Sequence, residues 1–202
     1  MKFFSYTLTP MLLLAVLVSC QNKKASPQTQ EEEITFNEAE YLAKGKSIAM
    51  ASFGALSGQL QAALREGGVP NAIAYCQLAA YPLLDSLAKE HNASIRRTSM
   101  QVRNPLNTPS PQEKMVLEQY EEGAKAGEAL SPIVQAVDAG TIAFYAPIKV
   151  NAFCLQCQGK PGDTLKEEDY AVIKERYPED LAIGYQDGDL CGMWSIRFSR
   201  AH

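Results

Sequence analysis

The sequence predicts an α+β domain in which long N-terminal helices pack on a small antiparallel sheet. Helical patterns dominate residues 37–91, whereas the β-compatible runs come later and are separated by further helices. This order argues against a βαβ wrap, in which strands and helices alternate. The length of 202 residues and the hydrophobic content of 46% suit one globular domain with a sizeable core. We therefore expect a single folded domain over residues 37–202.

The first predicted helix begins near Asn37. Asn37 and Glu40 have the spacing of a capping box, in which each side chain bonds a free backbone amide at the helix start. The Gly67-Gly68 pair marks the expected end of this helix. Apolar residues recur at helical spacing between these limits and indicate the buried face, namely Phe53, Leu56, Leu60 and Leu64.

A second helix is predicted over residues 71–80, because Pro70 suits the first position of a helix. Pro82 lacks the backbone donor that a helix interior needs, so it kinks this helix or starts a separate one. That last helical segment extends to about His91. Cys76 therefore lies on a helix.

Two shorter helices and an ordered loop are predicted further along. Residues 103–109 contain two prolines and form the loop. The sequence Ser110-Pro111-Gln112-Glu113 combines an N-cap, a first-turn proline and a capping-box carboxylate, so a helix begins there and ends near residue 129. Thr164 and Glu167 are expected to cap a brief helix that ends near Arg176.

The strands are predicted at residues 94–100, 141–150 and 192–198, which are rich in β-compatible side chains. Pro147 should interrupt the second strand, because proline cannot donate to a sheet ladder. The Asp187-Gly188 pair supplies a turn before the third.

The N-terminus has the pattern of a bacterial lipoprotein. Residues 1–19 carry one basic residue and then an apolar run, which is typical of a signal peptide. Cys20 follows Leu-Val-Ser and is the expected lipid-bearing residue, anchored to the membrane after cleavage. Residues 20–36 are mostly polar and predict a disordered tether. An aspartate directly after the lipid-bearing cysteine resembles a signal for retention in the inner membrane. Residue 21 is glutamine instead, so we expect an anchor in the outer membrane that faces the periplasm.

Charge and local motifs exclude two classes of function. The formal net charge of −4 provides no electrostatic footprint for nucleic acid. No serine or cysteine has a histidine placed beside it by a recognisable catalytic motif. We therefore expect a protein that is not an enzyme and has no nucleic-acid partner.

The most informative motif is Cys154-Leu155-Gln156-Cys157-Gln158. It differs by one residue from C-x-x-C-H, in which two cysteines attach haem covalently and the histidine ligates the iron. Gln158 takes the position of that histidine. An amide oxygen is a weak neutral donor, whereas imidazole is a strong iron ligand.

The surroundings of this motif resemble the bacterial family of single-haem c-type, PAS-like sensor domains. The resemblance covers about residues 38–198, and its segments are specific only in combination. The matching segments are Tyr75-Cys76-Gln77, Ala80-Tyr81-Pro82, residues 95–99, Arg103-Asn104-Pro105-Leu106-Asn107, residues 144–148, Cys154 to Cys157 with Gly159, Gly188-Asp189 and Gly192.

The resemblance implies a haem c site and a PAS-like sheet. Cys154 and Cys157 would carry the two thioether bonds, and Gln158 would stand where the proximal ligand belongs. Cys76 is the implied sulfur ligand to the haem iron on the opposite face. The cations that would hold the haem propionates are Arg96, Arg97 and Arg103.

Each assignment has an alternative. In the first alternative, Cys154 and Cys157 form a structural or redox-active disulfide, as is common in exported proteins. The redox-active form would make the chain a thiol-disulfide redox protein. Cys76 and Cys191 are small core residues or a disulfide pair. The arginines are surface charges paired with residues such as Glu113. A third possibility is a structural or binding lipoprotein without haem.

The remaining partners follow from what the sequence lacks. His91 and His202 are the only histidines, and neither is spaced as a metal site or as a replacement iron ligand. The chain ends at His202 without a further output domain, so we expect a sensor of this kind to act through a separate protein partner.

Overall fold

The computed structural model describes residue 1 and residues 35–200. The predicted signal peptide beyond Met1, the lipidation site at Cys20, most of the predicted tether and His202 lie outside the described residues. Within the part that is described, no helix is both long enough and apolar enough to cross a membrane.

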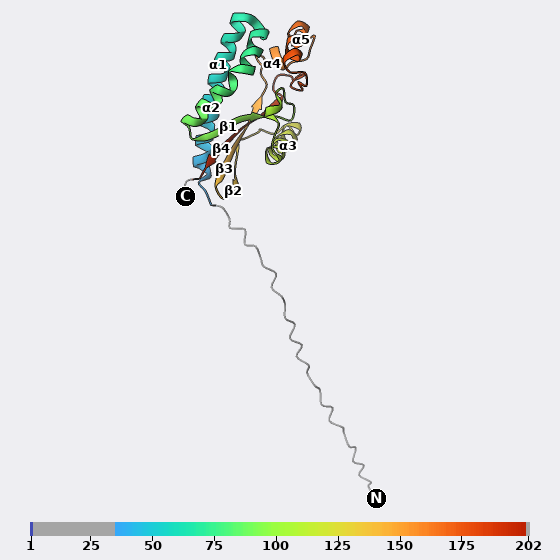
Figure 1. Ribbon diagram of the computed structural model, residues 1–202. Coiled ribbons are helices and arrows are strands. Elements are labelled where there is room, and N and C mark those ends of the chain that lie inside the picture. Colours follow the sequence, from blue (N-terminus) through green and yellow to red (C-terminus); the bar gives the residue numbers. More distant parts are fainter. Residues whose placement is uncertain (2–34, 201–202) are drawn as a thin grey trace. The chain divides into compact units, whose positions relative to one another are not determined.

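The fold is an α+β domain with one four-stranded sheet (Figure 1). The sheet is antiparallel throughout, with strand order β1-β4-β3-β2. The strands are β1 (Ala93–Thr98), β2 (Ile133–Asp138), β3 (Thr141–Lys149) and β4 (Leu190–Ser199). The helical elements are α1 (Glu38–Leu78), α2 (Ala80–Glu90), the 3-10 turn η1 (Pro105–Asn107), α3 (Pro111–Lys125), α4 (Leu155–Gln158) and α5 (Glu167–Arg176). The predicted fold class is confirmed.

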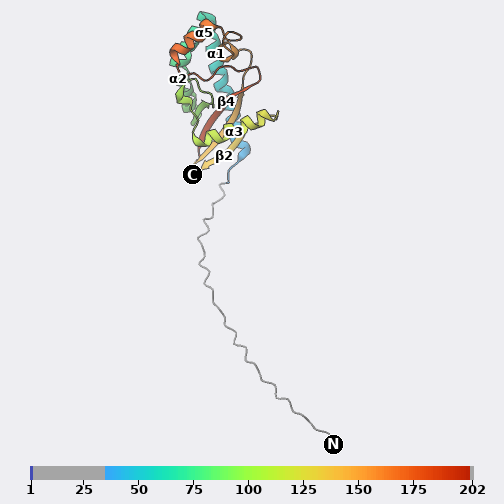
Figure 2. The ribbon, with the colours of Figure 1, turned by 90° about the vertical axis from the view of Figure 1, so that its right-hand side faces the viewer.

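Helices cover both faces of the sheet (Figures 1 and 2). The α1 and α2 helices pack on one face, where Leu56 and Leu84 join the buried strand residues Phe144 and Ile196. The α3 helix packs on the other face, where its core residues are Val116, Leu117 and Tyr120 and the strands contribute Ala143, Tyr145 and Met193. Side chains alternate between the two faces along each strand.

Helix α1 consists of two helical segments that meet at the predicted glycine pair, so the predicted end of the first segment is confirmed. Asn37 caps its start by accepting a hydrogen bond from the backbone N–H of Glu40. Gly67 and Gly68 leave helical geometry, and Gly68 has φ 66°, a conformation that favours glycine. The helix resumes at once and continues to Leu78, so Cys76 lies beyond the bend.

Four details differ from the sequence-based expectations. The pattern does not predict β2, although this strand forms one edge of the sheet. Pro147 does not interrupt β3, because β2 pairs with β3 only as far as Tyr145 and the proline lies past that point. The predicted cap of α5 is also wrong. Its N-cap is Lys166, while the hydroxyl of Thr164 accepts from the backbone N–H of Lys160. The α3 helix ends at Lys125, earlier than expected, but its Ser110–Glu113 capping box is confirmed.

Candidate functional site

One cavity collects the chemistry that the sequence singled out. It has a volume of about 290 Å³ and is lined by parts of α1, α2, β1, α4 and the start of β4. This volume is just below the range of about 300–1,000 Å³ that is usual for small-molecule sites. His91 caps the end of α2 and is not among the lining residues. The sequence-predicted residues that line the cavity are Cys76, Arg96, Arg97, Arg103, Cys154, Cys157 and Gln158, together with Cys191.

The walls of the cavity are largely apolar. The helical stripe predicted on α1 forms one wall, and the strands contribute Ile148 and Trp194. The stripe residues that line the cavity are Phe53, Leu56, Leu60 and Leu64. An apolar site with a few polar groups is the usual form of a small-molecule site.

The C-x-x-C segment is held in a tight turn at α4. Cys154 is the N-cap of α4, and its backbone N–H donates to the carbonyl of Asn151 at 2.9 Å. The peptide oxygen of Gln158 accepts from the N–H of Tyr185 at 3.0 Å. A Cβ on Gly159 would lie 2.1 Å from the hydroxyl of Thr164, so this position requires glycine. The side-chain amide of Gln158 has no hydrogen-bond partner among residues 35–200.

Arg103 ties the C-x-x-C segment to the loop before β4. Its Nε donates to Asp180 at 3.1 Å, and its Nη2 donates to the carbonyls of Cys157 and Ala182. The side chain of Asp180 is fully buried and that of Arg103 is 16% exposed. Sequence reasoning missed Asp180, because a lone carboxylate in a loop has no recognisable pattern. Arg103 therefore positions the site through bonds within the protein.

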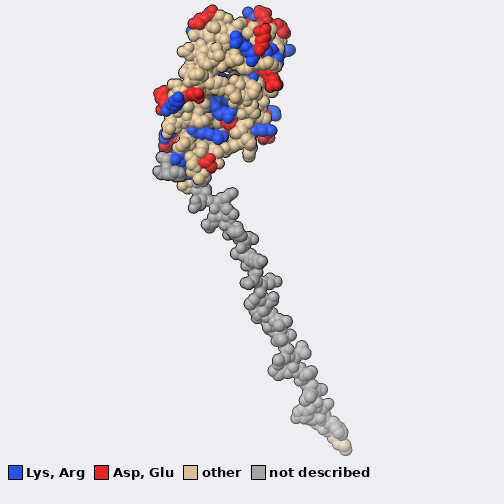
Figure 3. Space-filling model, viewed as in Figure 1, with Lys and Arg blue, Asp and Glu red and all other residues tan. Residues whose placement is uncertain are grey.

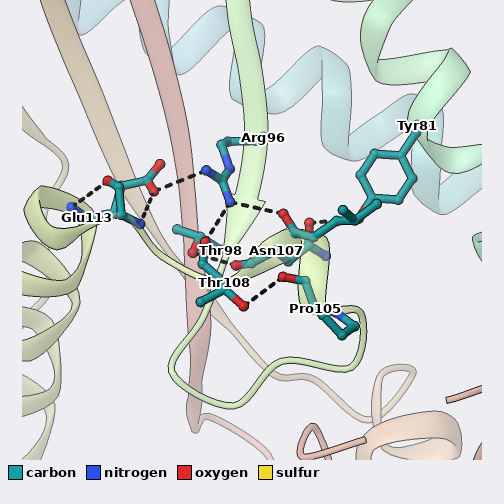
Figure 4. Close-up of polar contacts among 9 residues, drawn as sticks. Tyr81, Arg96, Thr98, Pro105, Asn107, Thr108 and Glu113 are labelled. Atoms are coloured by element: carbon teal, nitrogen blue, oxygen red, sulfur yellow. Dashed lines mark hydrogen bonds and ion pairs between the residues drawn. The ribbon is translucent and has the colours of Figure 1, made fainter. Parts of the chain in front are cut away.

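Arg96 is bonded on the α3 face of the sheet (Figure 4). Its Nη1 lies 3.3 Å from Oε2 of the fully buried Glu113, and its Nη2 donates to the carbonyls of Leu106 and Thr108. The sequence-based alternative that pairs this arginine with Glu113 is present in the structure. Burial disfavours the ionised form of Glu113, but hydrogen bonding by Ser110, the hydroxyl of Ser195 and the charge of Arg96 together hold its pKa below the usual value.

Arg97 is the next residue on β1 and has different surroundings. It is exposed, and its guanidinium lies 5.8 Å from the ring centroid of Trp194. Arg97 and Trp194 are also register partners on β1 and β4. No hydrogen bond or ion pair joins Arg97 to any residue between 35 and 200.

The four cysteines of the described region are free thiols. The disulfide between Cys154 and Cys157 is therefore not present in this structure and stays a prediction for the oxidised protein. Burial raises the pKa of Cys76, and it raises the pKa of Cys157 and Cys191 to about 11. These three thiols are therefore protonated near neutral pH. Such thiols are poor nucleophiles, because the thiolate is the reactive form.

Together, the fold and the site define an α+β domain with a thiol-lined cavity. The chain belongs to the Tll0287-like family, which it matches over residues 17–199. It is also similar to the crystal structure of the cyanobacterial haem protein Tll0287, with 23% sequence identity and a TM-score of 0.59. That likeness covers 83% of this chain and 99% of the other. No curated protein matches the chain.

The donor set of the cavity fits a haem, except for the nitrogen ligand. Cys154 and Cys157 would provide the two attachment thiols, and Cys76 would add a thiol that a metal would deprotonate on binding. No imidazole lines the cavity within the described residues. That region also contains no cluster of three or more His, Cys, Asp or Glu that would hold a bare metal ion.

Proposed function

We propose that this chain is a periplasm-facing lipoprotein whose cavity binds a haem-type ligand in a degenerate site, as a non-catalytic sensing or binding module. The observation that carries the proposal is the convergence of Cys76, Cys154, Cys157 and Gln158 on one apolar cavity. Membership of the Tll0287-like family and the likeness to a haem protein support the choice of ligand.

The residues have distinct roles in this proposal. Cys154 and Cys157 would hold the vinyl edge of a haem, and the thiol of Cys76 would ligate the iron. Gln158 would leave the other side of the iron without a strong protein donor. When bound, the haem would supply an iron centre that changes redox state or takes up a small ligand. A separate protein partner would receive that signal.

A titration with haemin tests the proposal. We expect the purified soluble domain, residues 34–202, to bind one haemin. Binding should change the absorption spectrum of the haemin until the site is saturated. The Cys76→Ala variant should bind with an altered spectrum, because thiolate donation changes the electronic state of the iron. Met115→Ala is the matched control, since this sulfur-containing side chain is 69% exposed and lies outside the cavity. Absence of saturable binding, or identical spectra for Cys76→Ala and the parent, would refute the haem role.

The lipid anchor needs a separate experiment. We expect the full chain to fractionate with membranes, because the two or three acyl chains of a lipoprotein hold far more firmly than one. Cys20→Ala should yield soluble protein. If this variant stays with the membrane after a salt wash, the anchor is not a lipid at Cys20.

A thiol-disulfide protein is the second candidate, because four free thiols share one cavity. Burial raises the pKa of Cys157 to about 11, so this thiol would not be the attacking one in such a reaction. The rate of reaction with a chromogenic aromatic disulfide separates the two candidates. Slow reaction at pH 7 that accelerates towards pH 11 supports a binding site, and fast reaction at pH 7 supports redox chemistry.

A further inference from the structure

The cavity has a charge opposite to that of the chain. The chain has a formal net charge of −4. In contrast, the charged residues that line the cavity are Asp85, Arg96, Arg97, Arg103 and Lys149. Basic side chains gather on the middle of the face drawn in Figure 3, over the region of β1. A cleft lined mainly by one sign of charge attracts ligands of the other sign.

Two of these cations are already neutralised by the protein. Arg96 pairs with Glu113, and Arg103 pairs with Asp180. Both carboxylates are fully buried, and both arginines also donate to backbone carbonyls. These two arginines therefore have little capacity left for a ligand.

Arg97 and Lys149 have no such partners within residues 35–200. Asp85 is the only carboxylate among the described lining residues, and no ion pair joins it to either cation. Arg97 is the better placed of the two cations, because it lies over the ring of Trp194 at 5.8 Å. Its charge also acts inside the cavity: burial raises the pKa of Cys76, and Arg97 is the largest opposing influence.

We propose that Arg97 makes the cavity selective for apolar ligands that carry a carboxylate, which its guanidinium binds with two parallel hydrogen bonds. The planar guanidinium matches the geometry of a carboxylate, whereas an ammonium group acts as a point charge. The inference rests on the proposed function and adds to it the residue that recognises the anionic group. Trp194 packs beneath the guanidinium and limits its motion.

A pair of metal-free probes isolates this interaction from any thiol–iron bond. Protoporphyrin carries two carboxylates, and its dimethyl ester has the same ring without them. Trp194 is the single tryptophan of the chain, so quenching of its fluorescence reports binding next to Arg97. We expect the free acid to bind about tenfold more tightly than the ester, as one charge-assisted contact implies.

Three variants of the soluble domain assign the preference. Arg97→Gln should lower the affinity for the acid about tenfold and leave that for the ester unchanged. Arg97→Lys should keep only part of the preference for the acid over the ester, because lysine retains the positive charge but lacks the two parallel donors of the guanidinium. Arg65→Gln is the matched control, since this exposed arginine of α1 lies outside the cavity lining and its loss removes the same charge.

The outcomes separate the inference from the proposed function. Equal binding of acid and ester by the parent, or an equal loss for Arg97→Gln and Arg65→Gln, would overturn the role of Arg97 and leave ligand binding intact. A preference that disappears in Lys149→Gln and persists in Arg97→Gln would also overturn it. Binding of neither probe would overturn the inference, and the haemin titration, in which the thiol of Cys76 can ligate the iron, tests the proposed function separately.

Discussion

Arg96 and Arg97 are neighbours on β1, yet they lie on opposite faces of the sheet and in different surroundings. Arg96 faces α3 and is bonded to the buried Glu113 and to two carbonyls. Arg97 faces the cavity, lies over Trp194 and has no polar partner in the described residues. On the face with α3 the cation is paired with a buried carboxylate, of which Oε2 is bonded and Oε1 has no hydrogen-bond partner, whereas the cation on the cavity face is unpaired within the described residues. This contrast separates a charge that stabilises the fold from one that is free to bind a ligand.

The largest expected effect concerns the ion pair between Arg96 and Glu113. Glu113→Gln removes the charge that Arg96 and the N–H of Ser110 contact. The variant should lose about 3 kcal/mol of unfolding free energy, because it leaves a partly buried cation without its counter-ion. Chemical denaturation of the soluble domain would measure this loss.

The matched control is Glu118→Gln on the exposed side of the same helix. Glu118 lies 3.8 Å from Lys114, with both side chains about half exposed. Its substitution should change the unfolding free energy by less than about 1 kcal/mol. Equal losses for the two variants would show that the Arg96–Glu113 network contributes no more than a surface pair.

Acid pH sharpens the comparison. The pKa of Glu113 is lowered on folding, so its ionised form stabilises the folded state above the pKa that it has in the unfolded chain. That contribution should disappear as the pH falls below about 4.5 and through the lower pKa of the folded state. The stability difference between the parent and Glu113→Gln should therefore shrink in acid. A difference that is constant from pH 7 to pH 3 would contradict this assignment.

The smallest expected effect is on the cavity face. Arg97→Gln breaks no hydrogen bond within the described residues and loses only the contact with Trp194. We expect its unfolding free energy to change by less than about 1 kcal/mol. A loss as large as that of Glu113→Gln would mean that Arg97 is structural, and the contrast between the two faces would fail.

Sequence patterns predicted the parts of the fold that depend on local signals. The capping box at Ser110 and Glu113 lies as expected, whereas of the apolar stripe only Leu56 is buried and Phe53 is 50% exposed at the cavity. The strand β2 was missed, because an edge strand gains its partner from the hairpin with β3 and not from its own composition. Pro147 was misjudged because its tolerance depends on where the neighbouring strand ends.

The sequence predicted which residues line the candidate site, but not which of its arginines are already paired within the protein. The family resemblance implied that Cys76 lies close to Cys154 and Cys157, and all three line the cavity. The three arginines are alike in sequence. The sequence offered Glu113 as a partner without saying for which arginine, and it gave no sign of Asp180. Only the tertiary structure assigns Glu113 to Arg96 and Asp180 to Arg103.

The central claim is that this cavity is a haem site that lacks only its histidine, and Gln158→His tests it most directly. The substitution completes C-x-x-C-H in a segment already held by α4. Gln156→His is the control, because this exposed residue of the same helix does not line the cavity. In cells with the haem-maturation machinery, Gln158→His should acquire covalent haem with an intense blue-region absorption band, while the parent and Gln156→His do not. A folded, exported Gln158→His protein without colour would contradict the claim.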